Sequence, residues 1–473
     1  MQIEVIGAVT FVLGLVGWVA GARFAVPVFF VSTLLSAAAA LILSALGGAN
    51  IQPAHLLLGF LALALLTSRT SLHRAGSALV FPKAGFWLLL TAVYATLSAV
   101  FLPRIFAGTT YVFAIARSDI GPGIISMSLA PTSGNITQAI YFVGDVLCFL
   151  VFYDIASRPD GFKTAVNAAL IAAAINLAFA AIDYGSYLVG LGDALAVIRN
   201  ANYRMLDDAM VMGFKRIVGS FPEASTFAYF TVGFFAFCTK LWLEGIRPRL
   251  TAMLAVSSLL ALACATSSTG YVATAGFLGL LFLAGLVQVL SRPVRRTTLV
   301  LIMVFPLIAA AGLIGLRLNP PAWNTLSDVI DASIFEKLNS SSGIERGKWN
   351  DQALVNFTQT HGLGAGDGSV RASSFPIAVL ANIGIPGALT YGVFICGLLF
   401  GRGDRWQHPF PASCQSAARW ACLAQLIGAS VAGSFIDLGL PFFIFAGLAC
   451  AGPEPARAPR PMPALPSAAA STA

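Results

Sequence analysis

Long apolar segments with few charged residues constrain the fold of this chain more than any other feature. Hydrophobic residues make up 58% of the 473 residues and charged residues only 10%. A soluble domain, by contrast, has about 25% charged residues. This composition excludes a soluble enzyme, a disordered chain and a disulfide scaffold. We therefore expect an all-α polytopic integral membrane protein.

The apolar segments are long enough to cross a membrane as helices. A helix rises about 1.5 Å per residue, so about 20 residues span a hydrocarbon core of about 30 Å. A window of that length predicts about 13 transmembrane helices. Their approximate bounds are 3–21, 24–46, 53–68, 84–102, 136–157, 163–182, 224–243, 250–266, 269–290, 298–316, 373–400, 415–433 and 436–452.

Positive charge is distributed unequally between the two sides of this predicted topology. Sixteen of the 28 lysines and arginines lie on one side, in short loops, at helix ends or in the C-terminal tail. The positive-inside rule makes that side cytoplasmic. The excess of basic residues therefore does not indicate nucleic-acid binding. We expect a single transmembrane domain over 1–452 and a disordered cytoplasmic tail over 453–473.

The long loops all lie on the opposite side of the predicted topology. They cover about 103–135, 183–223 and 317–372. The cytoplasmic loops are too short for a nucleotide-binding domain, and the glycines at 362–368 lack the Lys-Ser/Thr of a phosphate-binding P-loop. The cysteines and histidines form no metal-binding pattern. We expect chemistry on the outer face, without a metal or other cofactor.

The second long loop ends with two adjacent cations, Lys215 and Arg216. A predicted helix start follows, where Pro222 suits the first turn and Glu223 interacts favourably with the positive helix end. These residues could bind an anion. The cations could equally anchor the loop at the membrane surface, an alternative that applies above all to Lys215.

The third long loop contains a predicted amphipathic helix followed by a glycine-rich segment. The helix has Trp349, Leu354 and Phe357 on one side and charges, including Arg346 and Lys348, on the other. Glycine lets backbone N–H groups approach a ligand, and successive N–H groups favour anions. A glycine-rich segment is more often only flexible, but the neighbouring cations favour an anion site. The candidate residues of this segment are His361, Gly364, Gly366, Asp367 and Arg371.

Arginines beside membrane entry points indicate a phosphate-bearing ligand. Guanidinium forms planar paired hydrogen bonds with phosphate and stays charged at working pH. A lipid-linked pyrophosphate would present its anion at this depth. Phospholipid headgroups are the alternative ligand.

The order of these segments resembles the bacterial O-antigen polymerase/ligase family, which comprises glycosyltransferases of the GT-C kind. The resemblance covers roughly residues 205–395. The similar segments are Arg216 with Gly219-Ser220-Phe221-Pro222-Glu223, the turn Thr266–Gly270, Arg346 with Trp349 and Ala353-Leu354, Gly362–Gly366, and Asn382–Gly387.

The resemblance implies that Arg216 and Arg346 handle the pyrophosphate of an undecaprenyl-linked donor. Ligases of this family have a His-Asn pair where this chain has Ser373-Ser374. Asn382 replaces a common glutamate, and Ser268 replaces an arginine that is often found in the turn. These departures favour a polymerase of repeat units over a ligase.

The expected function is therefore polymerisation of undecaprenyl-diphosphate-linked oligosaccharide repeat units at the periplasmic face of the bacterial inner membrane. The product would be an exopolysaccharide, O-antigen or capsule. The alternatives are an O-antigen ligase that acts on lipid A core, and a flippase for lipid-linked oligosaccharide. The implied partners are the lipid-linked donor and acceptor, membrane lipid, a chain-length regulator and the flippase of the same pathway.

The expected site has three catalytic residues, Arg216, Arg346 and Glu223. Glu223, His361 and Asp367 are the candidates for the general base, which the sequence does not decide. Asp145 lies inside a predicted span, where a carboxylate either serves function or pairs within the bundle. The expected substrate-binding residues are Lys215, Lys348, Arg371, His361, Asp367, Gly364 and Gly366.

Overall fold

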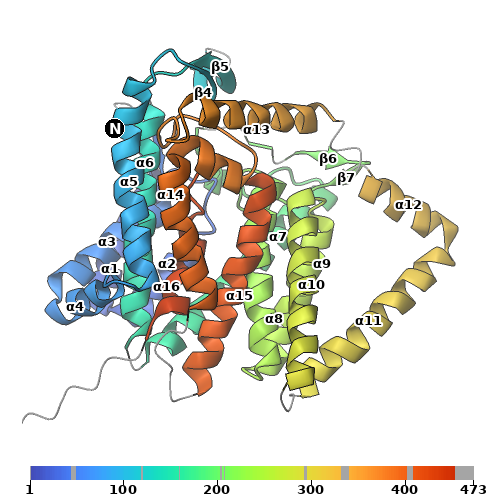
Figure 1. Cartoon of the computed structure of the whole chain (residues 1–473). Helices are drawn as coiled ribbons and strands as arrows, with labels where there is room; N and C mark the ends of the chain where they lie inside the picture. Colours follow the sequence, from blue (N-terminus) through green and yellow to red (C-terminus); the bar gives the residue numbers. More distant parts are fainter. Residues whose placement is uncertain are drawn as a thin grey trace, which may run out of the picture.

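The protein is a mostly helical bundle (Figure 1). This computed structural model describes residues 2–43, 49–118, 121–158, 160–202, 205–206, 208–291, 296–331, 340–401 and 409–452. The predicted tail, 453–473, lies outside the described residues. The helices are α1 (Val5–Ala20), α2 (Ala22–Ser32), α3 (Pro53–Thr67), α4 (Arg69–Ala78), α5 (Ala84–Ile105), α6 (Ser133–Ala156), α7 (Gly161–Leu188), α8 (Ala224–Leu243), α9 (Pro248–Cys264), α10 (Ser268–Ser291), α11 (Arg296–Arg317), α12 (Pro320–Ile330), α13 (Ser341–Gln359), α14 (Phe375–Phe400), α15 (Pro409–Ala432) and α16 (Leu440–Cys450).

Short antiparallel strands accompany the helices, which the all-α expectation did not include. β1 (Gln2–Ile3), β2 (Leu41–Leu43) and β3 (Ala49–Ile51) form a small sheet. In the first long loop, β4 (Tyr111–Ser118) pairs with β5 (Gly121–Ser128). In the second, β6 (Met210–Val211) pairs with β7 (Phe214–Lys215), after a short 3-10 turn at Ala196–Ile198.

The structure contains helices that are long and apolar enough to cross a membrane, but not in the expected number. Among the described residues, seven helices are long and apolar enough to cross a membrane: α5, α6, α7, α8, α10, α11 and α14. α3 and α4 would add one more if they form a single span, although they meet at an angle of 105°. α1, α2, α9 and α16 are apolar but shorter. The thirteen expected spans are therefore not confirmed.

Two of the predicted spans contain much shorter helices. α2 ends at Ser32, and Ala37–Ala40 pack without helical structure against the second long loop, with Ala37 N donating to Ser220 O at 3.4 Å. In α16, every residue from Leu440 to Ala449 is buried. Hydropathy cannot distinguish contact with lipid from contact with protein, and an apolar helix of 10–14 residues is commonly a core helix.

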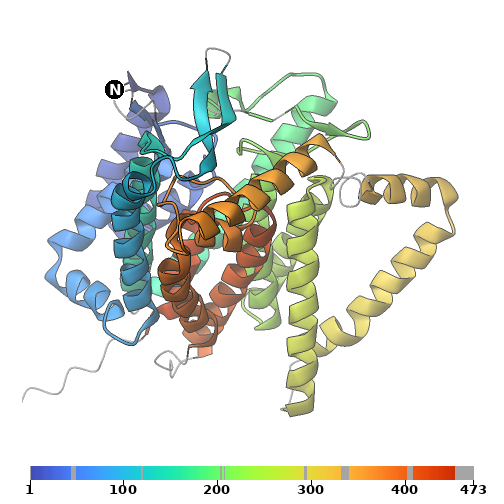
Figure 2. The ribbon, with the colours of Figure 1, turned by 45° about the horizontal axis from the view of Figure 1, so that its top comes forward.

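The long loops meet at one end of the helices. β4, β5 and α13 lie together at this end (Figures 1 and 2). Arg371 N donates to Phe113 O at 3.0 Å, and Asn356 Nδ2 donates to Thr110 Oγ1 at 2.7 Å. These bonds join the third long loop to the first, and the resulting layer carries most of the predicted site residues.

Candidate functional site

Asp183, near the end of α7, fixes the backbone of the second long loop. Its carboxylate accepts hydrogen bonds from Lys215 Nζ at 2.7 Å, Val218 N at 2.9 Å and Gly219 N at 3.1 Å. Lys215 is buried in this ion pair. Lys215 thus has an anchoring role. Together with Val218 and Gly219 it lets Asp183 hold the loop on both sides of Arg216.

Arg199 is a second member of this anchor. Its guanidinium pairs with Asp183 at 2.9 Å and with Asp193 at 2.8 Å, and it also donates to Gly219 O. Burial alone would lower the pKa of Arg199, but the two aspartates outweigh burial and raise it. Sequence reasoning missed Asp183 and Arg199 because each is a single charge that belongs to no motif, and their mutual contact joins α7 to the following loop.

Arg216 lies beside the start of α8, where Glu223 is the N-cap residue. Burial lowers the pKa of the Arg216 guanidinium, Glu223 raises it in part, and Arg346 lowers it further. Arg216 Nε is buried and has no hydrogen-bond partner among the residues that the structure describes. Tyr271 at the start of α10 also acts on Arg216 electrostatically, which brings the turn between α9 and α10 to the site.

Arg346 is carried by α13, which forms where the amphipathic pattern predicts a helix. The buried face of this helix comprises Trp349, Ala353 and Asn356, which follow helical spacing. Leu354, expected on that face, is 42% exposed. Asn356 Nδ2 also donates to Tyr111 O at 2.6 Å, so a polar contact with β4 helps to set the rotation of the helix.

Arg371 lies in the loop before α14, with its guanidinium over two aromatic rings. It is 5.1 Å from the Trp349 ring centroid and 5.8 Å from that of Phe435. Burial lowers the pKa of Arg371, Glu223 opposes this, and Arg346 lowers it further. Stacking on aromatic faces holds a guanidinium in place while leaving its N–H groups in the plane free to bind an anion.

The structure therefore brings three arginines and one glutamate from three segments together. Arg216, Arg346 and Arg371 each contribute a positive charge, and Glu223 interacts with both Arg216 and Arg371. We call these four residues the arginine cluster. Its net charge is about +2 with ionised side chains. The three arginines are half-buried, with Nε of Arg216 and Arg371 fully buried. Partly desolvated cations are stabilised by an anion that pairs with them, so the cluster is suited to a multiply charged anion.

The glycine-rich segment packs against the helices instead of forming an open cradle. A Cβ at residue 364 would lie 2.5 Å from Asn382 O, and one at residue 366 would lie 2.6 Å from Pro103. Gly366 N donates to Asn382 O at 2.9 Å. Gly364 and Gly366 have positive φ, 87° and 99°. The glycines are thus required by backbone conformation and close packing.

Two asparagines secure the rest of this segment. Asn382, fully buried in α14, accepts from Val370 N at 3.0 Å and donates to Val370 O at 2.8 Å. Asn135 of α6 donates to Asp367 O at 2.7 Å and to Ser369 Oγ at 2.8 Å. The amide of Asn382 bonds both ways to the backbone, which a carboxylate at this position could not do.

Asp437, between α15 and α16, is a carboxylate that sequence reasoning did not consider. It lines a cavity of about 160 Å³ together with Glu223, Tyr229 and Ser434. It also lines a second cavity, of about 330 Å³, into which His55 extends from α3. Sequence reasoning could not place Asp437 in a site, because its neighbours come from helices that lie far apart along the chain.

Asp437 is half-buried and lies near two buried carboxyls, those of Asp145 and Asp367. Asp145 of α6 is 1% exposed and interacts electrostatically with Asp437, so it faces the interior of the bundle. Asp367 has both carboxyl oxygens buried without a partner among the described residues. Burial, with a further contribution from Asp437, raises the pKa of Asp367 to about 8. Asp367 is therefore largely protonated at neutral pH.

The two remaining predicted residues, His361 and Lys348, are exposed. His361 follows α13, and its ring centroid is 6.3 Å from that of Phe106. Lys348 lies on α13. In the described part of the chain, no group of three or more His, Cys, Asp or Glu side chains is placed to hold a metal ion.

Comparisons with protein families, curated proteins and solved structures find no match for this chain. The best guide to function is therefore the geometry of the arginine cluster and of the residues around it.

Proposed function

We propose that this protein polymerises undecaprenyl-diphosphate-linked oligosaccharide repeat units at the periplasmic face of the bacterial inner membrane. One lipid-linked glycan is the donor and another provides the acceptor hydroxyl. The hydroxyl attacks the anomeric carbon of the donor, the bond to the lipid diphosphate breaks, and the proton of the hydroxyl passes to a base. The lipid diphosphate is the leaving group.

The observation that carries this proposal is the arginine cluster. Arg216 and Arg371 each interact with Glu223 and with Arg346, and Nε of both Arg216 and Arg371 is buried without a partner in the described structure. A diphosphate supplies the missing negative charge and acceptor oxygens. Fixed donors that bind the growing charge on the leaving group stabilise the transition state by about 3–4 kcal/mol each.

Glu223 is the proposed general base. It belongs to the arginine cluster and also lines the 160 Å³ cavity that it shares with Asp437. An acceptor hydroxyl in this cavity would meet a carboxylate that also interacts with the diphosphate-binding arginines. A base must reach the attacking hydroxyl, and Glu223 is the predicted catalytic carboxylate in that position.

The test uses a strain that lacks the protein and makes the lipid-linked repeat unit. Complementation with wild type restores long polymer. Complementation with Arg216→Ala or Arg346→Ala leaves single repeat units on the outer face, while both variants stay inserted in the membrane. Arg104→Ala is the matched control, because Arg104 is exposed at the end of α5 at the same end of the bundle.

The same strain separates the other candidate functions. Repeat units trapped on the cytoplasmic face of the deletion strain would indicate a flippase. Long polymer that forms but is not joined to lipid A core would indicate a ligase. If Arg346→Ala made as much polymer as wild type, the arginine cluster would have no role in polymerisation or in ligation.

A further inference from the structure

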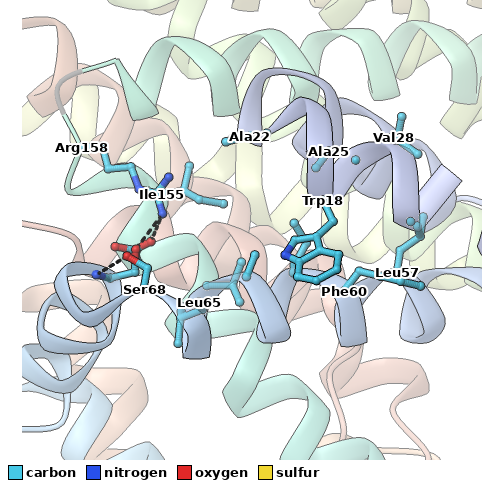
Figure 3. Close-up of a pocket in the computed structure, with 18 of the residues that line it drawn as sticks. Trp18, Ala22, Ala25, Val28, Leu57, Phe60, Leu65, Ser68, Ile155 and Arg158 are labelled. Atoms are coloured by element: carbon cyan, nitrogen blue, oxygen red, sulfur yellow. Dashed lines mark hydrogen bonds and ion pairs between the residues drawn. The ribbon is translucent and has the colours of Figure 1, made fainter.

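A second polar site lies at the opposite end of the bundle from the arginine cluster. α6 begins beside the glycine-rich segment, and its other end leads to Arg158. There a cavity of about 500 Å³ lies among α1, α2, α3, α4 and α6 (Figure 3). Charge bias predicts this end to be cytoplasmic. The proposed polymerisation does not use this cavity.

Most of the cavity wall is apolar. Trp18 of α1, Val28 of α2 and Phe60 of α3 line one end, away from Arg158 (Figure 3). Small residues such as Gly17 and Ala25 also line it, where α1 and α2 pack closely together. The volume is within the range of about 300–1,000 Å³ that is typical of sites for small molecules. A hydrocarbon chain fits such a wall.

The other end of the cavity is cationic. Arg74 Nε lies 2.7 Å from Asp154 Oδ1, and Arg158 binds the other oxygen of the same carboxylate. Two arginines share one aspartate, so this end has a net charge of about +1. Arg158 also donates to Ser71 Oγ at 3.1 Å, and its Nε is buried without a partner among the described residues.

The start of α4 adds the positive end of a helix dipole to the same end. Ser68 is the N-cap residue, and it lines the cavity with Thr70 and Ser71. The side chain of Ser68 accepts from Ser71 N, while the first N–H groups of a helix have no partner within it. In Figure 3, Ser68 and Arg158 lie together at one end of the pocket.

We infer that this cavity binds one anionic phospholipid from the adjacent membrane leaflet. Its phosphate would meet Arg158 and the start of α4, and one acyl chain would lie along the apolar wall formed by α1, α2 and α3. Charge complementarity selects an anionic headgroup, and basic pockets between membrane helices are known binding sites for such headgroups. The site is separate from the one that would bind the lipid diphosphate.

Native mass spectrometry of the purified full-length chain, titrated with phosphatidylglycerol or with phosphatidylcholine of the same acyl chains, tests this inference. We expect one phosphatidylglycerol to be bound in preference to phosphatidylcholine. Arg158→Gln should weaken phosphatidylglycerol binding about tenfold, because a hydrogen bond to a charged group is lost. Asp154 keeps Arg74 as a partner in this variant. Arg249→Gln, at the exposed start of α9, is the charge-matched control.

A second variant tests the apolar part independently. Ala64→Phe places a ring in the cavity and should weaken the binding of both lipids. Ala309→Phe, on the exposed surface of α11, should leave the binding of both lipids unchanged. Equal binding of the two headgroups by wild type, or equal binding by Arg158→Gln and Arg249→Gln, would overturn the inference. So would displacement of phosphatidylglycerol by undecaprenyl phosphate at equimolar concentration.

Discussion

Lys215 and Asp183 form an ion pair that is almost completely buried, with Nζ and Oδ1 2.7 Å apart and side-chain exposures of 8% and 1%. Removal of one partner of a buried pair costs about 3–5 kcal/mol, because the other charge stays buried. We therefore predict that Asp183→Ala lowers the free energy of unfolding by about that amount. Thermal unfolding of the purified protein in detergent measures it.

The control for this prediction is Asp160→Ala. Its ion pair with Lys163 is exposed, at 62% for Asp160 and 69% for Lys163. Exposed pairs contribute about 0–1 kcal/mol. Equal stability of the two variants would contradict the anchoring role of Asp183. Arg216→Ala should unfold at nearly the same temperature as wild type, which separates loss of activity from loss of structure.

The glycine-rich segment gives a prediction with an internal control. Gly364→Ala should destabilise the protein by about 1–3 kcal/mol, since residue 364 has positive φ and the added Cβ would meet Asn382 O. Gly347→Ala in α13 has open space around the new Cβ and should be neutral or stabilise the helix by about 0.5–1 kcal/mol. Melting temperatures distinguish the two. A stable but inactive Gly364→Ala protein would instead support a direct role in anion binding.

Asp367 makes stability depend on pH. Its pKa is about 8 in the folded state and 3.8 ordinarily, so between these values the folded chain binds a proton that the unfolded chain has lost. The free energy of unfolding therefore falls as pH rises through this interval, by up to about 1.4 kcal/mol per pH unit, and levels off above it. Asp367→Asn should remove this dependence. Parallel melting curves for wild type and variant from about pH 5 to about pH 8 would contradict the assignment.

Apolar run length predicted most helices but not how many of them face lipid. α5, α6, α7 and α14 form where the sequence predicts them, because an apolar run of this length has to satisfy its backbone internally. The segment 24–46 was wrongly predicted as one helix. Ala37–Ala40 in its second half are as apolar as its first half, but Ala37 bonds to Ser220 of another loop. Such partners are set by tertiary structure, which hydropathy does not encode.

The site residues also divide into those that the sequence could predict and those that it could not. Arg216, Arg346, Arg371 and Glu223 could be proposed from their loops and neighbours, and the structure brings them together. Asp437 could not, because it is a single carboxylate in a short connection and its neighbour Asp145 is about 290 residues away. Long-range pairs of this kind leave no periodic signal in the sequence.

The role of Glu223 as the base predicts opposite effects on rate and on binding. Glu223→Gln should lower the rate of glycosyl transfer about 10²–10⁴-fold, the usual contribution of a general base. Affinity for the lipid diphosphate should be unchanged or higher, because the variant removes a negative charge beside Arg216 and Arg371. Single-turnover rates and diphosphate binding of the purified protein measure the two effects.

Asp437→Asn is the comparison, since Asp437 lines the same cavity. A larger rate loss from Asp437→Asn than from Glu223→Gln would transfer the role of base to Asp437. Weaker diphosphate binding by Glu223→Gln would show that the carboxylate serves mainly to position the arginines.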